Sequence, residues 1–377
     1  MVVRHGNRSG WRGVARRVAE QKLNILLLAV PASWVLHVVA AGSAWTFVVG
    51  AIAIIPLAGL IGEATEELAK RTGPTLGGFL NATFGNAAEL IIAFVALRAG
   101  HIELVQATIT GSIVGNLLLV FGLAEFAGGL GRVSQRFDRR AAGNATIMLF
   151  LAVVALVMPA VFDLTVFGSL APRPPAIYYL SIGTSILLIG AYVSSLIYAF
   201  RTRRGLLRAV ESEEAPHWTT AQSIGVLSIA TVLTAVGAEV LIGGLEPMLA
   251  AFGWSELFTG VIVLAIVGNA AEHYSAVSAA RQDQMTLSVE IAVGSSAQVA
   301  LLVAPILVLA SFALGHPMTL LFHPFEIVAI GLSVLATAIV SLDGESNWVE
   351  GLQLLALYAI LALAFYFLPG GAVPSAT

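Results

Sequence analysis

Apolar stretches long enough to cross a lipid bilayer follow one another along nearly the whole chain. A bilayer core about 30 Å thick is spanned by about 20 residues of helix. Eleven stretches meet this requirement, and they cover residues 23–42, 44–68, 77–98, 104–130, 142–162, 177–200, 220–249, 256–280, 286–314, 322–342 and 348–368. Composition agrees, because 11% of the residues are charged, whereas a soluble domain has roughly 25%. We therefore predict an all-α polytopic membrane protein with about 11 transmembrane helices.

Positive charges are distributed unevenly between the predicted loops. The basic residues that precede the first stretch or follow the second, fourth, sixth and eighth all fall on one side of an eleven-span topology. Only Arg98 and Arg173 fall on the other side. Because cytoplasmic loops carry the excess of Lys and Arg, we expect the N-terminus in the cytoplasm and the C-terminus outside. The first 22 residues are basic and lack an early apolar stretch, which does not match a cleavable signal peptide.

The chain contains an internal repeat. The motif Gly85-Asn-Ala-Ala-Glu89 recurs 183 positions later as Gly268-Asn-Ala-Ala-Glu272, and the same offset pairs residues 111–112 with residues 294–295. Each half then holds five spans, and since five is odd, the halves must lie in opposite orientations, a plan common among secondary transporters. The expected organisation is a basic cytoplasmic N-terminus at 1–22, an extra helix at 23–42, a first repeat at 43–200, a hydrophilic cytoplasmic linker at 201–219, a second repeat at 220–369 and a tail at 370–377.

Each copy of the motif places one carboxylate inside a predicted membrane helix. A charge at that depth costs about 3 kcal/mol or more unless it is paired, solvated or neutralised, so Glu89 and Glu272 are functional candidates. Asn86 shares a helix face with Glu89, and Asn269 shares one with Glu272, because each pair is three positions apart. A two-fold pseudo-symmetry would bring both pairs to one point near the middle of the membrane.

Other positions are expected to meet the two carboxylates there. Glycines beside the asparagines can loosen a helix and expose carbonyl oxygens, although simple helix packing is an alternative role for them. Polar side chains on the next helix of each half face the same region. The additional candidates are Gly85, Gly268, Ser112, Asn116, Ser295 and Gln298.

Oxygen atoms dominate this predicted site. Carboxylate, amide, hydroxyl and carbonyl oxygens suit a hard cation such as Ca²⁺, which takes about six to eight of them. The chain has no cysteine, and no methionine cluster accompanies the motif, which argues against soft metals. One divalent cation or two protons neutralise two carboxylates equally well. This mutual exclusion is the physical basis of an antiporter.

Several further acidic residues have two interpretations that the sequence leaves open. Glu63, Glu66 and Glu67 either lie at the membrane interface or attract cations to a cytoplasmic mouth of the pathway. A role in the transport pathway is left open for Glu239, Glu246 and Glu290. We expect Glu326 to be interfacial and His273 to serve helix packing.

The sequence resembles the Ca²⁺/H⁺ antiporters, or cation/proton exchangers, of the calcium/cation antiporter superfamily. The resemblance begins near residue 44 and rests on the paired motifs together with residues 63–68, 111–116 and 294–298. It implies one extra helix plus two inverted five-helix repeats. It also implies that Glu89 and Glu272 alternately bind Ca²⁺ and H⁺, with the polar residues of the next helices nearby. One departure is Thr286, where the family has an acidic residue, with Glu290 where a small residue is usual.

We therefore expect a secondary active transporter, not an enzyme, that exchanges cytoplasmic Ca²⁺ for H⁺ without a cofactor. A Na⁺-driven Ca²⁺ or Mn²⁺ exchanger is the alternative. A membrane-embedded hydrolase fits less well, because acid and base roles need contrasting environments, and a channel would conduct without coupling. The expected setting is a prokaryotic plasma membrane, with the lipid bilayer, Ca²⁺ and H⁺ as partners and no nucleic acid. Homo-oligomerisation is left open.

Overall fold

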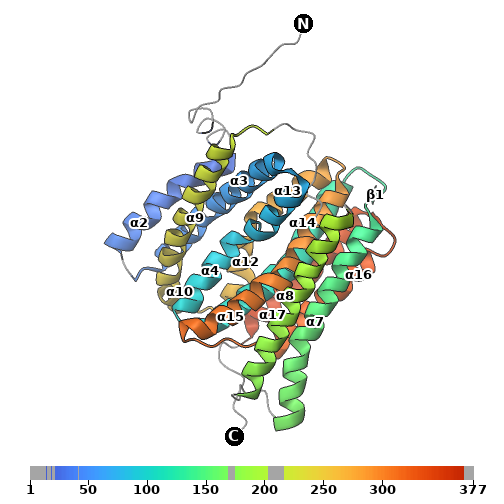
Figure 1. The fold of residues 1–377 in the computed structure, drawn as a ribbon. Helices are drawn as coiled ribbons and strands as arrows, with labels where there is room; N and C mark the ends of the chain where they lie inside the picture. Colours follow the sequence, from blue (N-terminus) through green and yellow to red (C-terminus); the bar gives the residue numbers. More distant parts are fainter. Residues whose placement is uncertain are drawn as a thin grey trace.

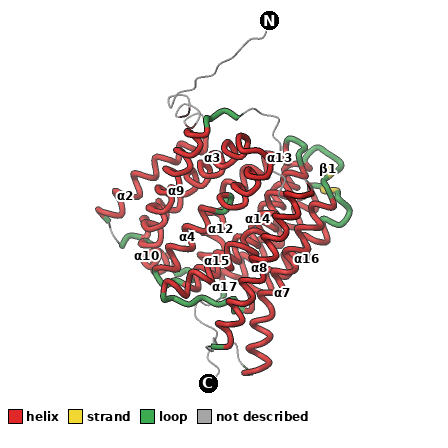
Figure 2. Tube along the Cα trace, in the orientation of Figure 1, coloured by secondary structure: helices red, strands yellow, loops and turns green. Residues whose placement is uncertain are grey.

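A computed structural model describes residues 14, 18, 22–40, 42–168, 175–202 and 216–368. These residues form a bundle of long helices (Figures 1 and 2). Within the described residues, seven helices are long and apolar enough to cross a membrane, or up to eight if one bent pair is a single span. They are Ala44–Thr72, Ile102–Gly129, Ala142–Val166, Ala176–Tyr198, Thr220–Gly243, Met285–Leu314 and Trp348–Phe367. A polytopic membrane protein is confirmed. The predictions for most of 1–22, for Arg173, for 203–215 and for the tail fall outside the described residues.

The first half of the chain begins with two short elements. These are the 3₁₀ segment η1 (Lys22–Leu28) and the helix α2 (Ala29–Val39), which replace the single predicted span 23–42. The other elements of this half are α3 (Ala44–Phe84), α4 (Ala87–Arg98), α5 (Ile102–Val114), η2 (Gly115–Val120), α6 (Phe121–Gly129), α7 (Arg139–Phe167) and α8 (Ala176–Thr202).

The second half begins at α9 (Thr220–Gly243), whose first turn is closed by a capping box between Thr219 and Gln222. The elements that follow are α10 (Leu245–Phe252), α11 (Glu256–Phe258), η3 (Thr259–Leu264), α12 (Ala265–Gly268), α13 (Ala270–Arg281), α14 (Met285–Gln298), η4 (Val299–Val303), α15 (Ala304–Leu314), α16 (Pro324–Val340) and α17 (Trp348–Phe367).

The 41 residues of α3 do not form one straight rod. A β-carbon placed on Gly77 would lie only 2.8 Å from the carbonyl oxygen of Ala69. Eight residues of straight helix separate two positions by about 12 Å, so the chain turns back on itself between Ala69 and Gly77. The apolar, membrane-length part of the element accordingly ends at Thr72. This turn lies between the predicted spans 44–68 and 77–98.

Three segments wind more loosely than an α-helix. η2, η3 and η4 are π-helical, and such turns are frequent near functional sites. The two motifs are 183 positions apart in the sequence. The same shift applied to η2 gives residues 298–303, which match η4 to within one residue. The two halves therefore share a local backbone irregularity as well as a sequence motif.

One small sheet departs from the all-α prediction. β1 (Gln135–Arg136) pairs antiparallel with β2 (Glu345–Ser346), and two-residue strands are too short to show any periodicity in a sequence. The Gln135 side chain donates hydrogen bonds to the carbonyl oxygen of Ala280 (2.9 Å) and to Asp283 Oδ1 (2.8 Å). The loops that follow α6, α13 and α16 thus meet at one end of the bundle, which we call the Gln135 end.

The loops at the opposite end of the Ile102–Gly129 span also contact one another. His101 Nδ1 lies 2.7 Å from Glu256 Oε1. Gln106 donates hydrogen bonds to the carbonyl oxygens of Thr319 (3.0 Å) and Leu321 (3.1 Å). We call this the His101 end. The loops that meet at each end are ones that the eleven-span topology places on the same side of the membrane.

Close helix crossings depend on small residues. α5 crosses η3 where a β-carbon on Gly111 would lie 2.2 Å from the carbonyl oxygen of Val261, and one on Gly260 would lie 2.5 Å from Ala107 Cβ. α3 packs along α9, with α2 against both, and α8 packs against α15 (Figure 1). α17 packs against α6. The glycines therefore allow α5, which follows the first motif, and η3, which precedes the second, to approach backbone to backbone, as in other membrane bundles.

Candidate cation site

Both copies of the Gly-Asn-Ala-Ala-Glu motif interrupt a helix. Gly85 and Asn86 separate α3 from α4, and Asn269 separates α12 from α13. Glu89 and Glu272 each lie in the first turn of the helix that follows the break. A helix N-terminus carries a partial positive charge that favours an anionic side chain there. The repeated motif thus builds the same local structure twice.

Asn86 begins a buried hydrogen-bond network between the two halves. Its side chain makes no capping hydrogen bond to its own helix. Instead, Asn86 Nδ2 donates to Gln298 Oε1 at 2.6 Å, and Asn86 Oδ1 accepts from Ser295 Oγ at 2.8 Å. A break in the first half is therefore held by α14, the second helix after the equivalent break in the second half.

Asn269 makes the corresponding contacts in the opposite direction. Its Nδ2 donates to Ser112 Oγ at 3.0 Å and to the carbonyl oxygen of Ala265 at 2.8 Å. Its Oδ1 accepts from Asn116 Nδ2 at 3.0 Å. Asn116 also donates to Ser295 Oγ at 3.1 Å, which joins both sets of contacts into one network.

The two carboxylates lie beside this network. Glu89 is 3% exposed, whereas Glu272 is partly exposed, and the two are close enough to interact electrostatically. A β-carbon on Gly268 would lie 3.1 Å from Glu89 Cγ. Two buried oxygens, Glu89 Oε1 and Asn116 Oδ1, have no hydrogen-bond partner among the described residues.

The ten predicted site residues are therefore gathered in one place. The glycines fit this description too, because a β-carbon on Gly85 would lie 3.7 Å from Gln298 Oε1. Carboxylate, amide and hydroxyl oxygens from four helices meet here. A set of oxygen ligands of this kind can hold a hard cation.

Two other acidic residues have mainly structural contacts. Glu67 is buried and accepts hydrogen bonds from the backbone N–H groups of His217 (2.6 Å) and Trp218 (2.8 Å). Glu326 lies in the first turn of α16, early in its span as predicted, but its side chain is buried rather than exposed at a membrane interface. It accepts a hydrogen bond from Thr110 Oγ1 at 2.8 Å.

The structure also brings out ionisable residues that no sequence pattern had marked. Glu125 is fully buried in α6, and neither carboxylate oxygen has a hydrogen-bond partner among the described residues. The cost of a charge within a membrane helix would have flagged it, but it has no counterpart in the repeat. His101 and Glu256 are 155 positions apart, so only the fold brings them together.

The chain matches the family model of the sodium/calcium exchanger protein family over residues 42–201 and 222–367. It is 44% identical over 368 residues to a Ca²⁺/H⁺ antiporter of Synechocystis sp., covering 92% of this chain and 97% of that relative. It is 45% identical over 332 residues to the Ca²⁺/H⁺ antiporter ChaA of Bacillus subtilis, covering 86% of this chain and 93% of that one.

Solved structures have the same architecture. Native YfkE superposes with a TM-score of 0.80 at 41% identity, over 92% of this chain and 100% of that chain. The H⁺/Ca²⁺ exchanger CAX superposes with a TM-score of 0.67 over 91% of each chain. Its identity of 14% means that this second likeness shows the fold alone. The chain belongs to the sodium/calcium exchanger protein family, in agreement with the resemblance carried by its two Gly-Asn-Ala-Ala-Glu motifs.

Proposed function

We propose that this protein is a secondary active transporter that exchanges cytoplasmic Ca²⁺ for H⁺. The observation that carries the proposal is the pair of buried oxygens, Glu89 Oε1 and Asn116 Oδ1, that lack a partner among the described residues. A buried polar atom without a partner costs about 1–3 kcal/mol, and more if it is charged. A transported cation or proton would supply the missing interaction during each cycle.

Glu89 and Glu272 are the proposed exchanging groups. One Ca²⁺ neutralises both carboxylates, with ligand oxygens at about 2.3–2.6 Å. Two protons neutralise them equally well and remove the charges that attract Ca²⁺. Binding of one cargo therefore excludes the other, and the free energy of the proton gradient can drive Ca²⁺ in the opposite direction.

The amide and hydroxyl groups have the proposed role of orienting the carboxylates and completing the coordination. Asn86 and Asn269 each link a helix break to the opposite half, and Ser112, Ser295, Asn116 and Gln298 hold the two asparagines in place. Gly85 and Gly268 leave room for the side chains that pack against the breaks. Any small displacement of these groups would change the distance between ligand oxygens.

The proposed architecture is one extra helix followed by two inverted repeats of five helices. The equivalent positions of η2 and η4 support it, as does the crossed pattern of hydrogen bonds around Asn86 and Asn269. Arg132 and Arg136 lie at the Gln135 end, so we assign that end to the cytoplasm by the positive-inside rule. The proposed location is a prokaryotic plasma membrane.

The relatives support H⁺ rather than Na⁺ as the counter-ion. The two at 44% and 45% identity carry the name Ca²⁺/H⁺ antiporter. Solved chains of a sodium-calcium exchanger match at 17% identity with a TM-score of 0.55, a likeness that supports the fold only. The named relatives are transporters, so we propose neither an enzymatic reaction nor a cofactor.

Transport by the purified protein in liposomes tests this function. In sodium-free buffer, an imposed pH gradient should drive Ca²⁺ uptake, and a pH-sensitive dye should report proton movement in the opposite direction. An absolute requirement for Na⁺ would replace this proposal with Na⁺-driven exchange. Ca²⁺ flux without proton counterflow would indicate a channel.

A further inference from the structure

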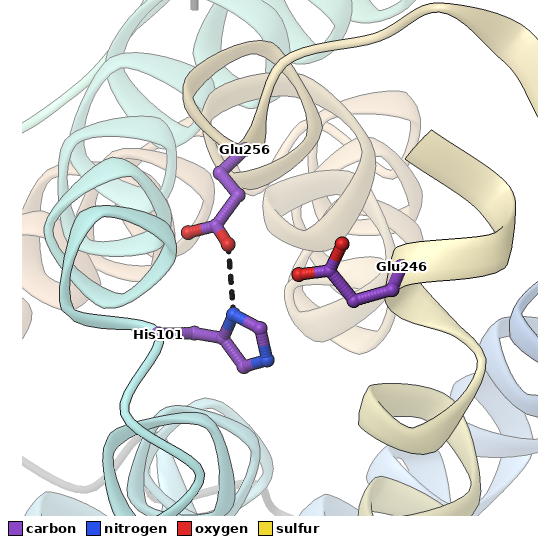
Figure 3. Close-up of side chains that lie close together, drawn as sticks. All are labelled: His101, Glu246 and Glu256. Atoms are coloured by element: carbon purple, nitrogen blue, oxygen red, sulfur yellow. Dashed lines mark hydrogen bonds and ion pairs between the residues drawn. The ribbon is translucent and has the colours of Figure 1, made fainter. Parts of the chain in front are cut away.

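A second group of metal-ligating side chains lies at the His101 end. His101, Glu246 and Glu256 each offer one ligand atom, and these atoms all lie within 4.8 Å of one another (Figure 3). The group is separate from the central site, because Ser112 lies eleven positions beyond His101, about 16 Å along a helix. None of the three residues takes part in the network around Asn86 and Asn269.

Three separate elements supply the three side chains. His101 directly precedes α5, Glu246 lies in the first turn of α10, and Glu256 is the first residue of α11. The chain bends by 109° between α10 and the helix that begins at Glu256. This bend turns both carboxylates toward the imidazole ring, as Figure 3 shows.

Two members of the group are already held in position. One oxygen of Glu256 accepts a hydrogen bond from the backbone N–H of Leu104 at 3.2 Å, while the other lies 2.7 Å from His101 Nδ1. Glu246 is exposed and makes no hydrogen bond or ion pair with any other described residue. One carboxylate and the imidazole therefore form a fixed pair, and the second carboxylate is free to close on a ligand.

The local charge favours a divalent cation. A neutral imidazole with two carboxylates carries two negative charges, and Glu103 lies close enough to Glu256 to interact with it electrostatically. Arg98, three positions before His101 in the chain, forms an ion pair with Glu239. A hydrogen-bonded His–Glu pair is complete with one carboxylate. The second carboxylate, that of Glu246, adds repulsion between like charges, and a bound divalent cation would relieve this repulsion.

We propose that His101, Glu246 and Glu256 bind a divalent first-row transition metal ion, with Zn²⁺ as the best match, from the solution at the His101 end. Imidazole nitrogen suits Zn²⁺, whereas Ca²⁺ and Mg²⁺ take oxygen ligands. One nitrogen and two carboxylate oxygens leave the fourth tetrahedral position for water. The flexible Glu246 side chain closes the site around the ion.

Metal binding has a consequence for transport that rests on the proposed function. The ion joins a segment of the first half to α10 and α11 of the second half. Alternating access in transporters with inverted repeats involves movement of these parts relative to one another. Zn²⁺ on the His101 side of the membrane therefore slows Ca²⁺ transport, although it does not compete for the central site.

Calorimetric titration of the purified full-length protein with Zn²⁺ tests the site directly. Saturating Ca²⁺ keeps the central site occupied, and a buffer at about pH 8 favours the unprotonated imidazole that a metal ion needs. One Zn²⁺ should bind per chain. His101→Gln, Glu246→Gln and Glu256→Gln should each weaken binding at least about tenfold, because loss of even an outer-shell partner of a metal ligand costs that much.

Two control variants make the result decisive. His316→Gln removes a histidine at the same end, close to Gly100, and should leave Zn²⁺ binding unchanged. Glu89→Gln alters the central site and should also leave it unchanged. Loss of binding in Glu89→Gln with normal binding in His101→Gln would place the ion at the central site and overturn the proposal. Absence of Zn²⁺ binding in the wild type would overturn it as well.

Two further measurements distinguish loss of the metal site from misfolding of a variant and from failure of the proposed function. Co²⁺ bound in place of Zn²⁺ should show a visible absorption band that the exposed variant Glu246→Gln shifts or loses. In liposomes, Zn²⁺ on the His101 side should inhibit Ca²⁺ uptake by the wild type but not by His101→Gln. If neither the wild type nor any variant transports Ca²⁺, the proposed function fails. The titration still decides whether the metal site exists. Equal inhibition of wild type and His101→Gln would overturn the link between the site and transport.

Discussion

The side chain of Glu89 packs directly against the backbone of Gly268. The space between them is so small that a β-carbon on Gly268 would lie 3.1 Å from Glu89 Cγ. Each residue belongs to a different copy of the same motif, and the two copies lie 183 positions apart in the chain. The contact therefore couples the carboxylate of one half to the helix break of the other half.

Replacement of Gly268 by alanine should reduce Ca²⁺ transport by up to roughly tenfold. Glu89 must move by a few tenths of an ångström to make room, whereas a displacement of about 1 Å at a reacting group costs about a hundredfold. The new methyl group forces Glu89 to move, while the protein should remain folded. Initial rates of Ca²⁺ uptake in liposomes measure the effect. Gly183→Ala is the matched control, since a β-carbon there has no atom within 4 Å. Wild-type rates in Gly268→Ala would show that the position of Glu89 is not important.

Removal of either central carboxylate should abolish exchange. Glu89→Gln and Glu272→Gln each keep the shape of the side chain but remove its charge. The single carboxylate that remains cannot neutralise a divalent cation, and one of the two exchangeable protons is lost. Proton-driven Ca²⁺ uptake should fall to background in both variants. Glu66→Gln is the control, because the Glu66 side chain is 63% exposed beside Lys70. Near-normal uptake by either central variant would contradict the site assignment.

Gly111 and Gly115 form a matched pair for a stability measurement. A β-carbon on Gly111 would lie 2.2 Å from the carbonyl oxygen of Val261, a backbone atom that cannot easily move, whereas one on Gly115 would meet nothing within 4 Å. Overpacking of this kind costs about 1–3 kcal/mol. The thermal unfolding midpoint in detergent should therefore fall for Gly111→Ala and stay unchanged or rise for Gly115→Ala. Equal midpoints would argue against the close crossing of α5 and η3.

Glu67 should matter for stability more than its neighbour Glu66. Glu67 accepts hydrogen bonds from the N–H groups of His217 and Trp218 just before α9, and a hydrogen bond to a charged group contributes about 1.5–3 kcal/mol. Glu67→Ala should lower the unfolding midpoint clearly, and Glu66→Ala should change it little. A larger effect from Glu66→Ala would contradict the role given to Glu67.

Acid should destabilise the start of α16 through His323. The neutral ring accepts a hydrogen bond from the N–H of Phe325 just before the helix begins, and burial lowers the pKa of His323 below its ordinary value of 6.5. The unfolded state therefore binds the proton more readily, and stability should fall as the pH decreases through about 6.5. The unfolding midpoint measured against pH checks this. His323→Asn keeps a cap without a titrating group, so its midpoint should lose this part of the pH dependence.

Local sequence properties accounted for most of the helices. Apolar stretches such as 142–162 and 348–368 correspond closely to α7 and α17, because a helix satisfies all its backbone hydrogen bonds internally and needs no distant partner. Ends were less predictable. α16 begins at Pro324 because the proline lacks an N–H group and fits the first turn. The predicted first span, in contrast, is divided into η1 and α2.

The candidate site could be proposed from the sequence because its motif is repeated. The sequence by itself determined which residues are candidates, since two identical motifs within predicted membrane helices mark Glu89 and Glu272 as equivalent positions whatever the details of packing. Only the tertiary structure decided how they meet. Hydrogen bonds such as Asn86 to Gln298 join residues 212 positions apart, and the group around His101 has no sequence pattern at all. Contacts of this kind depend on how whole helices pack, and no local periodicity encodes that arrangement.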